Sequence, residues 1–316
     1  MKIETVSEIS RRIHGELGKA IVGKDLVLRK MILGLLTNSH ILLEDFPGLA
    51  KTMIAKTIAA TTQCTFSRVQ FTPDLLPADI TGTYVYNQKT GEFELRKGPI
   101  FTNILLADEI NRSPPKTQAA LLEAMQERQT TLDGRLHKIE NPFVVIATQN
   151  PIEFEGVYQL PEAQLDRFIM KLRVGYPGRA EEFQILKGRI DRRQDDFVVG
   201  SVASPETIID MQNAIEDVHI DDDVLFYLID IVRETRSHAQ VEVGASPRGS
   251  IALLKLARAN AAFEGRDYVI PDDVKMIAVE ALSHRIIPKT ESWVRGFDSR
   301  TIVEEILSKI SVPRVE

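Results

Sequence analysis

Residues 44–52 read EDFPGLAKT, a short loop that ends in a lysine and a hydroxyl residue, the side chains that bind phosphate and its metal ion. The general phosphate-loop pattern is G-x-x-x-x-G-K-[ST], in which backbone N–H groups at a helix N-terminus point at phosphate oxygens. We expect Lys51 to neutralise the β- and γ-phosphate oxygens and the Thr52 hydroxyl to bind Mg²⁺. The predicted phosphate-binding residues are Pro47, Gly48, Leu49, Ala50, Lys51, Thr52 and Met53.

The loop departs from the general pattern at two glycine positions. Asp45 stands at the first glycine and Ala50 at the glycine before the lysine, whereas Gly48 remains. Alanine is disfavoured where φ is positive, so we expect a stiffer loop whose turnover differs from that of a glycine-rich one. An ordinary strand–turn–helix with a capping lysine is the alternative interpretation of this segment.

An acidic pair, Asp108 and Glu109, directly follows the apolar run NILLA. Both carboxylates would lie at the carboxyl end of a strand, which is where α/β sheets bind ligands. Asp108 is predicted to hold Mg²⁺ through water, and Glu109 to polarise the attacking water. Alone, the pair could equally be a solvated strand end, but its position after the phosphate loop favours a catalytic role.

Two further polar side chains follow in the order expected for the same site. Asn150 ends the apolar run FVVIATQN and could donate to a γ-phosphate or the lytic water, although Asn-Pro also favours turns. Arg167 lies in LPEAQLDRF, and an arginine given to a neighbour's γ-phosphate can contribute ~10³–10⁵ in rate. A surface ion pair with Glu162 or Asp166 is the alternative for Arg167, and would be worth little.

Arg248 opens a predicted helix in the segment GASPRG. A cation at a helix N-terminus opposes the helix dipole, which suggests an anionic partner such as a γ-phosphate. Pairing with a nearby carboxylate is the alternative.

The elements that must position these residues form two regions. Short apolar runs alternate with helices in the first half, and this pattern predicts a parallel sheet covered on both faces. The predicted strands are 40–45, 66–70, 103–108 and 143–150, with helices at 51–62 and 114–128. Two β-hairpins are predicted, at 84–98 and 129–139, the second with a strong type I′ turn signal at Asp133-Gly134.

From about residue 178 onward, helical patterns replace strands. Ser204-Pro205 and Ser246-Pro247 are typical helix starts. We therefore predict an α/β nucleotide-binding domain over residues 1–190, with hairpin inserts near 72–100 and 129–140. A helical domain is predicted over 191–316.

Composition narrows the classes of function. The 316 residues carry a net charge of −6 and no basic run, so nothing indicates a nucleic-acid surface. The single cysteine, Cys64, cannot form an internal disulfide, and no apolar stretch approaches the ~20 residues that span a bilayer. These features predict a cytoplasmic protein without a membrane span.

Five segments together resemble a known family. EDFPGLAKT, LLADEINRSPPKTQAALLEAMQE, VIATQNP, LPEAQLDRF and GASPRG are similar to the Walker A, Walker B, sensor 1, arginine-finger and sensor 2 segments of AAA+ ATPases. More closely, they resemble those of the MoxR branch, and the resemblance covers about residues 8–285.

The resemblance implies a five-stranded parallel sheet in an αβα core followed by an all-helical lid. It implies ATP and Mg²⁺ as ligands, with Thr52 and Asp108 at the metal and Glu109, Asn150, Arg167 and Arg248 as the catalytic set. It also places Val22 and Gly23 near the adenine. Relatives usually form hexameric rings, are linked to von Willebrand factor A domain proteins, and act as chaperones in metal-cofactor insertion or complex maturation.

The sequence thus predicts an ATP-hydrolysing motor that remodels protein clients as a homo-oligomeric ring. Two alternatives remain open. One is a DNA-directed AAA+ motor, because similar hairpins occur in replicative helicases. The other is a nucleotide-binding scaffold that hardly hydrolyses, for which Ala50 is the only motivation.

Overall fold

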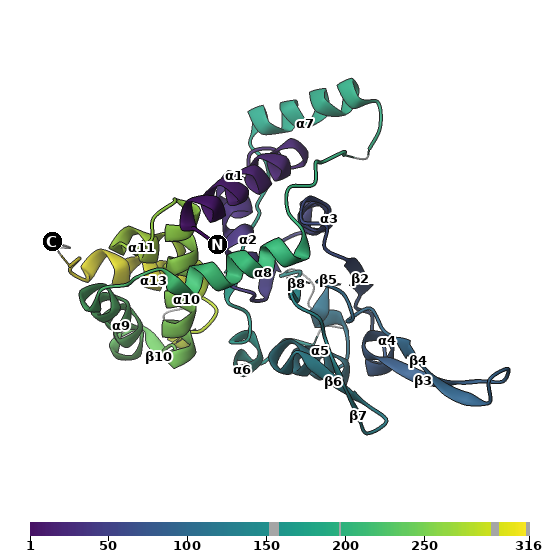
Figure 1. The fold of residues 1–316 in the computed structure, drawn as a ribbon. Helices are drawn as coiled ribbons and strands as arrows, with labels where there is room; N and C mark the ends of the chain where they lie inside the picture. Colours follow the sequence, from purple (N-terminus) through teal and green to yellow (C-terminus); the bar gives the residue numbers. More distant parts are fainter. Residues whose placement is uncertain (152–157, 196, 292–296, 314–316) are drawn as a thin grey trace.

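A computed structural model describes residues 1–151, 158–195, 197–291 and 297–313 (Figure 1). The chain opens with two helices, α1 (Ile3–Ala20) and α2 (Asp25–Leu36). Every third or fourth residue of α1 is buried, so one stripe of the helix faces the core and the other faces solvent. The N-terminal helices therefore act as a platform, against which later parts of the chain pack.

A parallel five-stranded sheet forms the centre of the first region. Its strands, in spatial order, are β2 (Phe66–Gln70), β5 (Ile104–Asp108), β8 (Val144–Gln149), β1 (Ile41–Glu44) and β9 (Met170–Leu172). All four pairings are parallel. This confirms the predicted fold class and the four strands named from sequence. The short β9 had not been located.

Side chains of the sheet alternate between two cores. Ile104 and Leu106 pack in one hydrophobic cluster, whereas Leu105 packs in the other. The strands read as continuously apolar because both faces are covered, and α3 (Lys51–Thr61) and α5 (Pro115–Glu127) are among the covering helices. This double burial fixes the strands and therefore the positions of their carboxyl ends.

Two hairpins extend from this core at the lower right of Figure 1. The first is β3 (Gly82–Asn87) with β4 (Glu92–Lys97), preceded by the short helix α4 (Pro77–Thr81), and the second is β6 (Gln129–Leu132) with β7 (Arg135–Lys138). Asp133 and Gly134 both have positive φ, 47° and 75°, as the predicted turn requires. The two hairpins touch, because the Tyr84 hydroxyl lies 3.2 Å from the His137 ring nitrogen Nε2.

The second half of the chain is almost entirely helical, as predicted. Its elements are the short helix α6 (Glu162–Leu165), then α7 (Arg179–Arg192), α8 (Pro205–Ala214), η2 (Ile215–Asp217), α9 (Asp222–Ser237), α10 (Pro247–Phe263), α11 (Pro271–Leu282) and α13 (Ser299–Lys309). A two-stranded ribbon, β10 (Val241–Val243) with β11 (Ile287–Pro288), was not predicted. Ser204 and Ser246 cap α8 and α10.

The helical half packs directly on the N-terminal helices. Helix α10 contacts both α1 and α2, and one hydrophobic cluster runs from Val6 to Ile306. Helix α7 stands apart from this cluster, at the top of Figure 1, and has no buried residue. The boundary predicted at residue 190 falls in its last turn and stays a prediction. Among the described residues, no helix is both long and apolar enough to cross a membrane.

Candidate functional site

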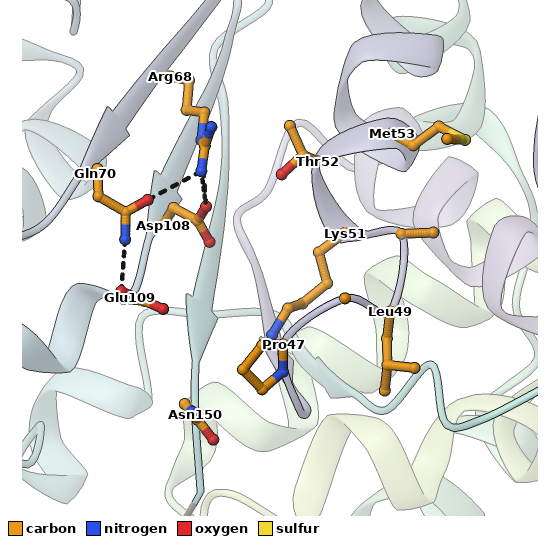
Figure 2. A pocket seen from close by; sticks show the side chains of 12 residues that line it. Pro47, Leu49, Lys51, Thr52, Met53, Arg68, Gln70, Asp108, Glu109 and Asn150 are labelled. Atoms are coloured by element: carbon orange, nitrogen blue, oxygen red, sulfur yellow. Dashed lines mark hydrogen bonds and ion pairs between the residues drawn. The ribbon is translucent and has the colours of Figure 1, made fainter. Parts of the chain in front are cut away.

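Adjacent strands β5, β8 and β1 end at the same edge of the sheet, and this edge forms one wall of a cavity of about 430 Å³. The loop after β1 faces the carboxyl ends of β5 and β8 across it (Figure 2). The cavity is lined by Pro47, Gly48, Leu49, Ala50, Lys51, Thr52, Met53, Arg68, Gln70, Asp108, Glu109 and Asn150. Every predicted phosphate-loop residue, the acidic pair and Asn150 are thus brought together.

The loop holds its shape through a left-handed turn at Ala50. Gly48 has φ 81° and Ala50 has φ 56°, and α3 begins at the next residue, Lys51. The glycine of the general pattern is therefore replaced at a position that does need positive φ, as expected from the sequence. Because α3 starts here, the free N–H groups of its first turn lie at the cavity, where an anion would be stabilised.

The side chain of Lys51 is partly buried and already hydrogen-bonded within the loop. Its ammonium donates to the backbone oxygen of Asp45 at 2.7 Å. Burial lowers the pKa of Lys51, and the carboxylates of Asp108, Asp45 and Glu109 oppose that shift. The ammonium carries three hydrogens, so those not engaged by Asp45 can be donated to phosphate oxygens.

Asp45, the second departure from the glycine pattern, is a buried anchor for the loop. One carboxylate oxygen accepts from the N–H of Phe46 at 2.9 Å, and the other accepts from the N–H of Gly175 at 2.6 Å. Gly175 follows β9, and the ring of Phe46 stacks on Tyr176 in the same segment. Asp45 therefore ties the phosphate loop to the chain that leads into α7.

Asp108 has two partners that fix each of its oxygens. Thr148 of β8 donates its hydroxyl to Oδ1 at 2.7 Å, and the Arg68 guanidinium donates to Oδ2 at 2.7 Å. The side chain of Asp108 is 13% exposed, so its charge is compensated inside the cavity by Arg68.

Glu109 sits in a left-handed conformation with φ 57°. Its N–H donates to the Thr148 hydroxyl at 2.8 Å, which links it to Asp108. Its carboxylate accepts from the Gln70 amide at 2.5 Å and from Arg112 at 2.9 Å. A non-glycine residue held at positive φ is strained, and such strain is typical of functional positions.

Arg68 and Gln70 are site residues that the sequence interpretation missed. The run FSRVQ alternates, so the two side chains share one face of β2, and Gln70 is in register with Asp108 of β5. The Arg68 guanidinium also donates to the Gln70 amide oxygen at 3.0 Å, so one hydrogen-bonded group joins both acids (Figure 2). The alternation was visible, but only the pairing of β2 with β5 places it at this site.

The two predicted catalytic arginines lie elsewhere. Arg167 and Arg248 line a second cavity of about 260 Å³, whose other charged residues are Arg128, Asp166, Lys255 and Arg285. Arg248 lies 3.8 Å from the Asp166 carboxylate, and within the described ranges no ion pair engages Arg167. The structure of the single chain therefore does not bring either arginine into the first cavity.

Val22 and Gly23 are also absent from the wall of the first cavity as described. Gly23 has φ 72°, and the Glu181 side chain occupies the space where a β-carbon on Gly23 would lie. Lys24 donates to the backbone oxygen of Tyr176 at 2.9 Å. The turn between α1 and α2 therefore rests against the segment that begins α7.

The donors present suit a hard cation held together with phosphate. Thr52 supplies a hydroxyl and Asp108 a carboxylate, which are oxygen ligands of the kind that Mg²⁺ prefers. No cluster of three or more acidic, histidine or cysteine ligands occurs in the part of the chain that the structure describes. A magnesium ion at this site would therefore depend on phosphate oxygens and water for its remaining ligands.

Comparisons with known proteins agree with this architecture. Residues 40–170 match the ATPase family associated with various cellular activities (AAA), and residues 233–306 match the AAA lid domain. The chain is 47% identical to the uncharacterised protein YeaC of Bacillus subtilis, over 95% of this chain and 96% of that protein. It is 41% identical to chaperone MoxR1 of Mycobacterium tuberculosis, over 95% of this chain and 81% of that protein.

A solved structure shares the whole fold. A crystal structure of a proposed ATPase from Cytophaga hutchinsonii superposes with a TM-score of 0.91 and 41% identity, covering 98% of this chain and 96% of that one. The family match, the relatives aligned over most of their length and the likeness of the solved structure therefore point to the same family. The chain belongs to the MoxR family of AAA+ ATPases.

Proposed function

We propose that the first cavity binds ATP with Mg²⁺ and hydrolyses it, and that the energy is used to remodel partner proteins. The observation that carries this proposal is the convergence of Lys51, Asp108, Glu109 and Asn150 on one cavity from three neighbouring strand ends. Hydrolysis of a triphosphate needs little covalent chemistry from the protein, so positioned charges and a positioned water suffice.

Each residue then has a defined task. Lys51 moves from the Asp45 carbonyl to the β- and γ-phosphate oxygens, and the N–H groups of the loop hold the same phosphates. Thr52 and Asp108 would hold Mg²⁺, which would neutralise charge on the phosphates. Glu109 orients and polarises the attacking water, and Asn150, 6% exposed at the end of β8, hydrogen-bonds the γ-phosphate or that water.

Reaching this arrangement requires two existing contacts to break. The Arg68–Asp108 ion pair must open for a cation to approach Asp108, and the Gln70–Glu109 hydrogen bond must open for Glu109 to face the water. Both contacts belong to one group on β2, so their release is expected to be coupled. The strained φ of Glu109 persists through this change, because Thr148 holds its N–H.

Arg167 and Arg248 are proposed to act on a neighbouring subunit. They lie together in a cavity in which cations outnumber acids, away from their own phosphate loop. A ring of copies would bring this cationic surface to the next subunit's triphosphate, where an arginine is worth ~10³–10⁵ in rate. We propose a homo-oligomeric ring, hexameric as is usual in the family.

The wider role is proposed from the same family membership. Chaperone MoxR1 is named for action on other proteins, and we propose protein clients here too, with metal-cofactor insertion as one form of maturation and a von Willebrand factor A domain protein as partner. The two hairpins, which expose Tyr86, Phe93 and Leu136, are the surfaces proposed to move against the client. The lone buried cysteine suits the cytoplasm.

The central test measures steady-state ATP hydrolysis by the wild-type chain and by Glu109→Gln. We expect Mg²⁺-dependent turnover in the wild type and a loss of roughly 10²-fold or more in the variant, with nucleotide binding retained. Equal rates in both would disprove the role of Glu109, and binding without turnover in the wild type would support the scaffold alternative.

The ring needs a separate experiment, in which Arg167→Ala and Glu109→Gln are mixed. The first variant has an intact cavity without its neighbour's Arg167, and the second can supply that arginine. We expect the mixture to hydrolyse ATP faster than the sum of the separate proteins. DNA should not stimulate the rate; clear stimulation would favour the DNA-directed alternative instead.

A further inference from the structure

Arg285, three residues beyond the last residue of α11, is a buried arginine that the proposed mechanism does not use. Its side chain is 3% exposed, and it donates to the Asp166 carboxylate at 2.8 Å. It also donates to the backbone oxygens of Phe168 at 2.7 Å and Ile169 at 3.1 Å. One side chain of the lid therefore holds the segment 166–169, which carries the end of the α6 turn into β9.

Asp166 stands between Arg285 and the two arginines proposed to act in trans. It directly precedes Arg167, it accepts from the Ser246 hydroxyl at 3.2 Å, and it lies 3.8 Å from the guanidinium of Arg248. Asp166 thus already forms a long ion pair with Arg248, which a closer approach would strengthen, and Arg167 is its chain neighbour. The 2.8 Å contact shows that Arg285 holds this carboxylate more closely than Arg248 does.

The charge balance of the second cavity depends on this arrangement. Burial lowers the pKa of Arg285 to about 10, with Asp166 opposing the shift, so the side chain is charged at neutral pH. Its charge is matched by Asp166. Positive charge therefore remains in excess in the cavity, carried by Arg128, Arg167, Arg248 and Lys255. Without Arg285, the unmatched acid would attract the half-exposed Arg248, since opposite charges pair strongly where water is partly excluded.

We propose that Arg285 is a positioning residue for catalysis in the neighbouring subunit. By occupying Asp166 and fixing the 166–169 segment, it keeps Arg248 and Arg167 available for the neighbour's γ-phosphate. Arg285 itself touches no reacting atom. This inference rests on the proposed function, in which those two arginines serve the next site around a ring.

The test is complementation between variants. Arg285→Met removes the charge but keeps much of the buried volume. We expect its ATP hydrolysis to fall roughly tenfold or more, with ATP affinity within about twofold of wild type, because its own phosphate cavity is intact. Mixing Arg285→Met with Glu109→Gln should restore hydrolysis above the sum of the two, because Glu109→Gln subunits supply correctly held arginines.

Two further variants separate charge from folding. Arg285→Lys keeps the cation for Asp166 and should retain more activity than Arg285→Met. The double variant Asp166→Asn/Arg285→Met removes the unmatched acid and should be more active than Arg285→Met alone, whereas a purely structural role predicts further loss. Arg300→Met is the matched control: it removes a partly buried arginine of α13 that pairs with Glu280 of α11, and it should hydrolyse at the wild-type rate.

The outcomes distinguish this inference from the proposed function. Complementation by Arg167→Ala with Glu109→Gln, but none by Arg285→Met with Glu109→Gln, overturns the role of Arg285 and leaves the ring intact. No complementation in either mixture overturns the trans arrangement itself. Wild-type turnover in Arg285→Met would also overturn the inference. If Arg285→Met does not fold, Arg285→Lys and the double variant decide the question. Hydrolysis retained in both supports the positioning role, and loss of hydrolysis in the double variant overturns it.

Discussion

Ala50→Gly tests whether the phosphate loop stores strain at its left-handed residue. Ala50 has φ 56° and ψ 13°, a conformation that costs an alanine roughly 1–2 kcal/mol. Glycine removes that cost but loses about 0.4–1 kcal/mol through the greater entropy of the unfolded chain. It also loses a half-buried methyl worth about 0.4 kcal/mol. The net expectation is a gain in unfolding free energy of about 0.5 kcal/mol.

Ala60→Gly is the matched control, because Ala60 is an exposed residue of the same helix α3 with ordinary helical φ. There the identical chemical change should cost about 0.5–1 kcal/mol, so the two variants should differ in sign. Urea denaturation of both variants beside wild type measures this. A loss at position 50 equal to that at position 60 would refute strain at Ala50. ATP affinity of Ala50→Gly should stay within about twofold, since the loop's N–H groups are unchanged.

Three other changes address the site and the core. Arg68→Ala should tighten Mg²⁺-dependent ATP binding about two- to fivefold, because a half-exposed ion pair worth about 0.5–1 kcal/mol no longer competes for Asp108. A weakening of about tenfold in a magnesium titration would instead make Arg68 a phosphate ligand. Asp45→Asn should lower the unfolding free energy by about 1–3 kcal/mol in urea, because charge-assisted bonds to two N–H groups weaken; no change would show that the anchor is dispensable. Burial lowers the pKa of His40 to about 3. Below pH 6.5 this histidine therefore becomes protonated in the unfolded chain but stays neutral in the folded chain. At pH 5 the difference lowers the free energy of unfolding by about 2 kcal/mol. In His40→Gln that share of the loss between pH 7 and 5 should vanish, and an unchanged pH profile would contradict the assignment.

Most of the fold could be predicted from the sequence, because the strands are long and apolar enough to be distinguished from the segments around them. The runs around Leu42, Leu105 and Val145 are buried on both faces, and each ends in a turn signal or a polar residue. The strand β9 was not located because three residues, Met170–Leu172, give too short a period to distinguish. The ribbon β10–β11 is similarly short and depends on pairing across many residues.

The candidate site could be predicted where residues close together in the chain form it. It was harder to predict where the pairing of distant segments brings residues to it. Lys51 and Thr52 follow from the loop pattern, and the requirement for positive φ at Ala50 follows from the glycine it replaces. Arg68 and Gln70 were missed, because only the register of β2 with β5 sets them beside the acidic pair.

The positions of Arg167 and Arg248 likewise depend on contacts between distant segments. Their order along the chain indicated a catalytic role, but not which cavity each would line. The packing of the lid on α1 and α2 places Arg248 beside Asp166, and Arg285 reaches the same acid from the end of α11. No local pattern encodes that meeting, since it joins segments far apart in the sequence.

Calorimetric titration of ATP with Mg²⁺ into the wild-type chain and into Lys51→Met tests most directly whether three strand ends surround a single triphosphate. One nucleotide bound per wild-type chain is expected, with affinity at least roughly tenfold weaker in the variant, because the desolvated cation facing the phosphates is gone. Equal affinity in the two proteins, or no binding by the wild type, would contradict a phosphate site at this edge of the sheet.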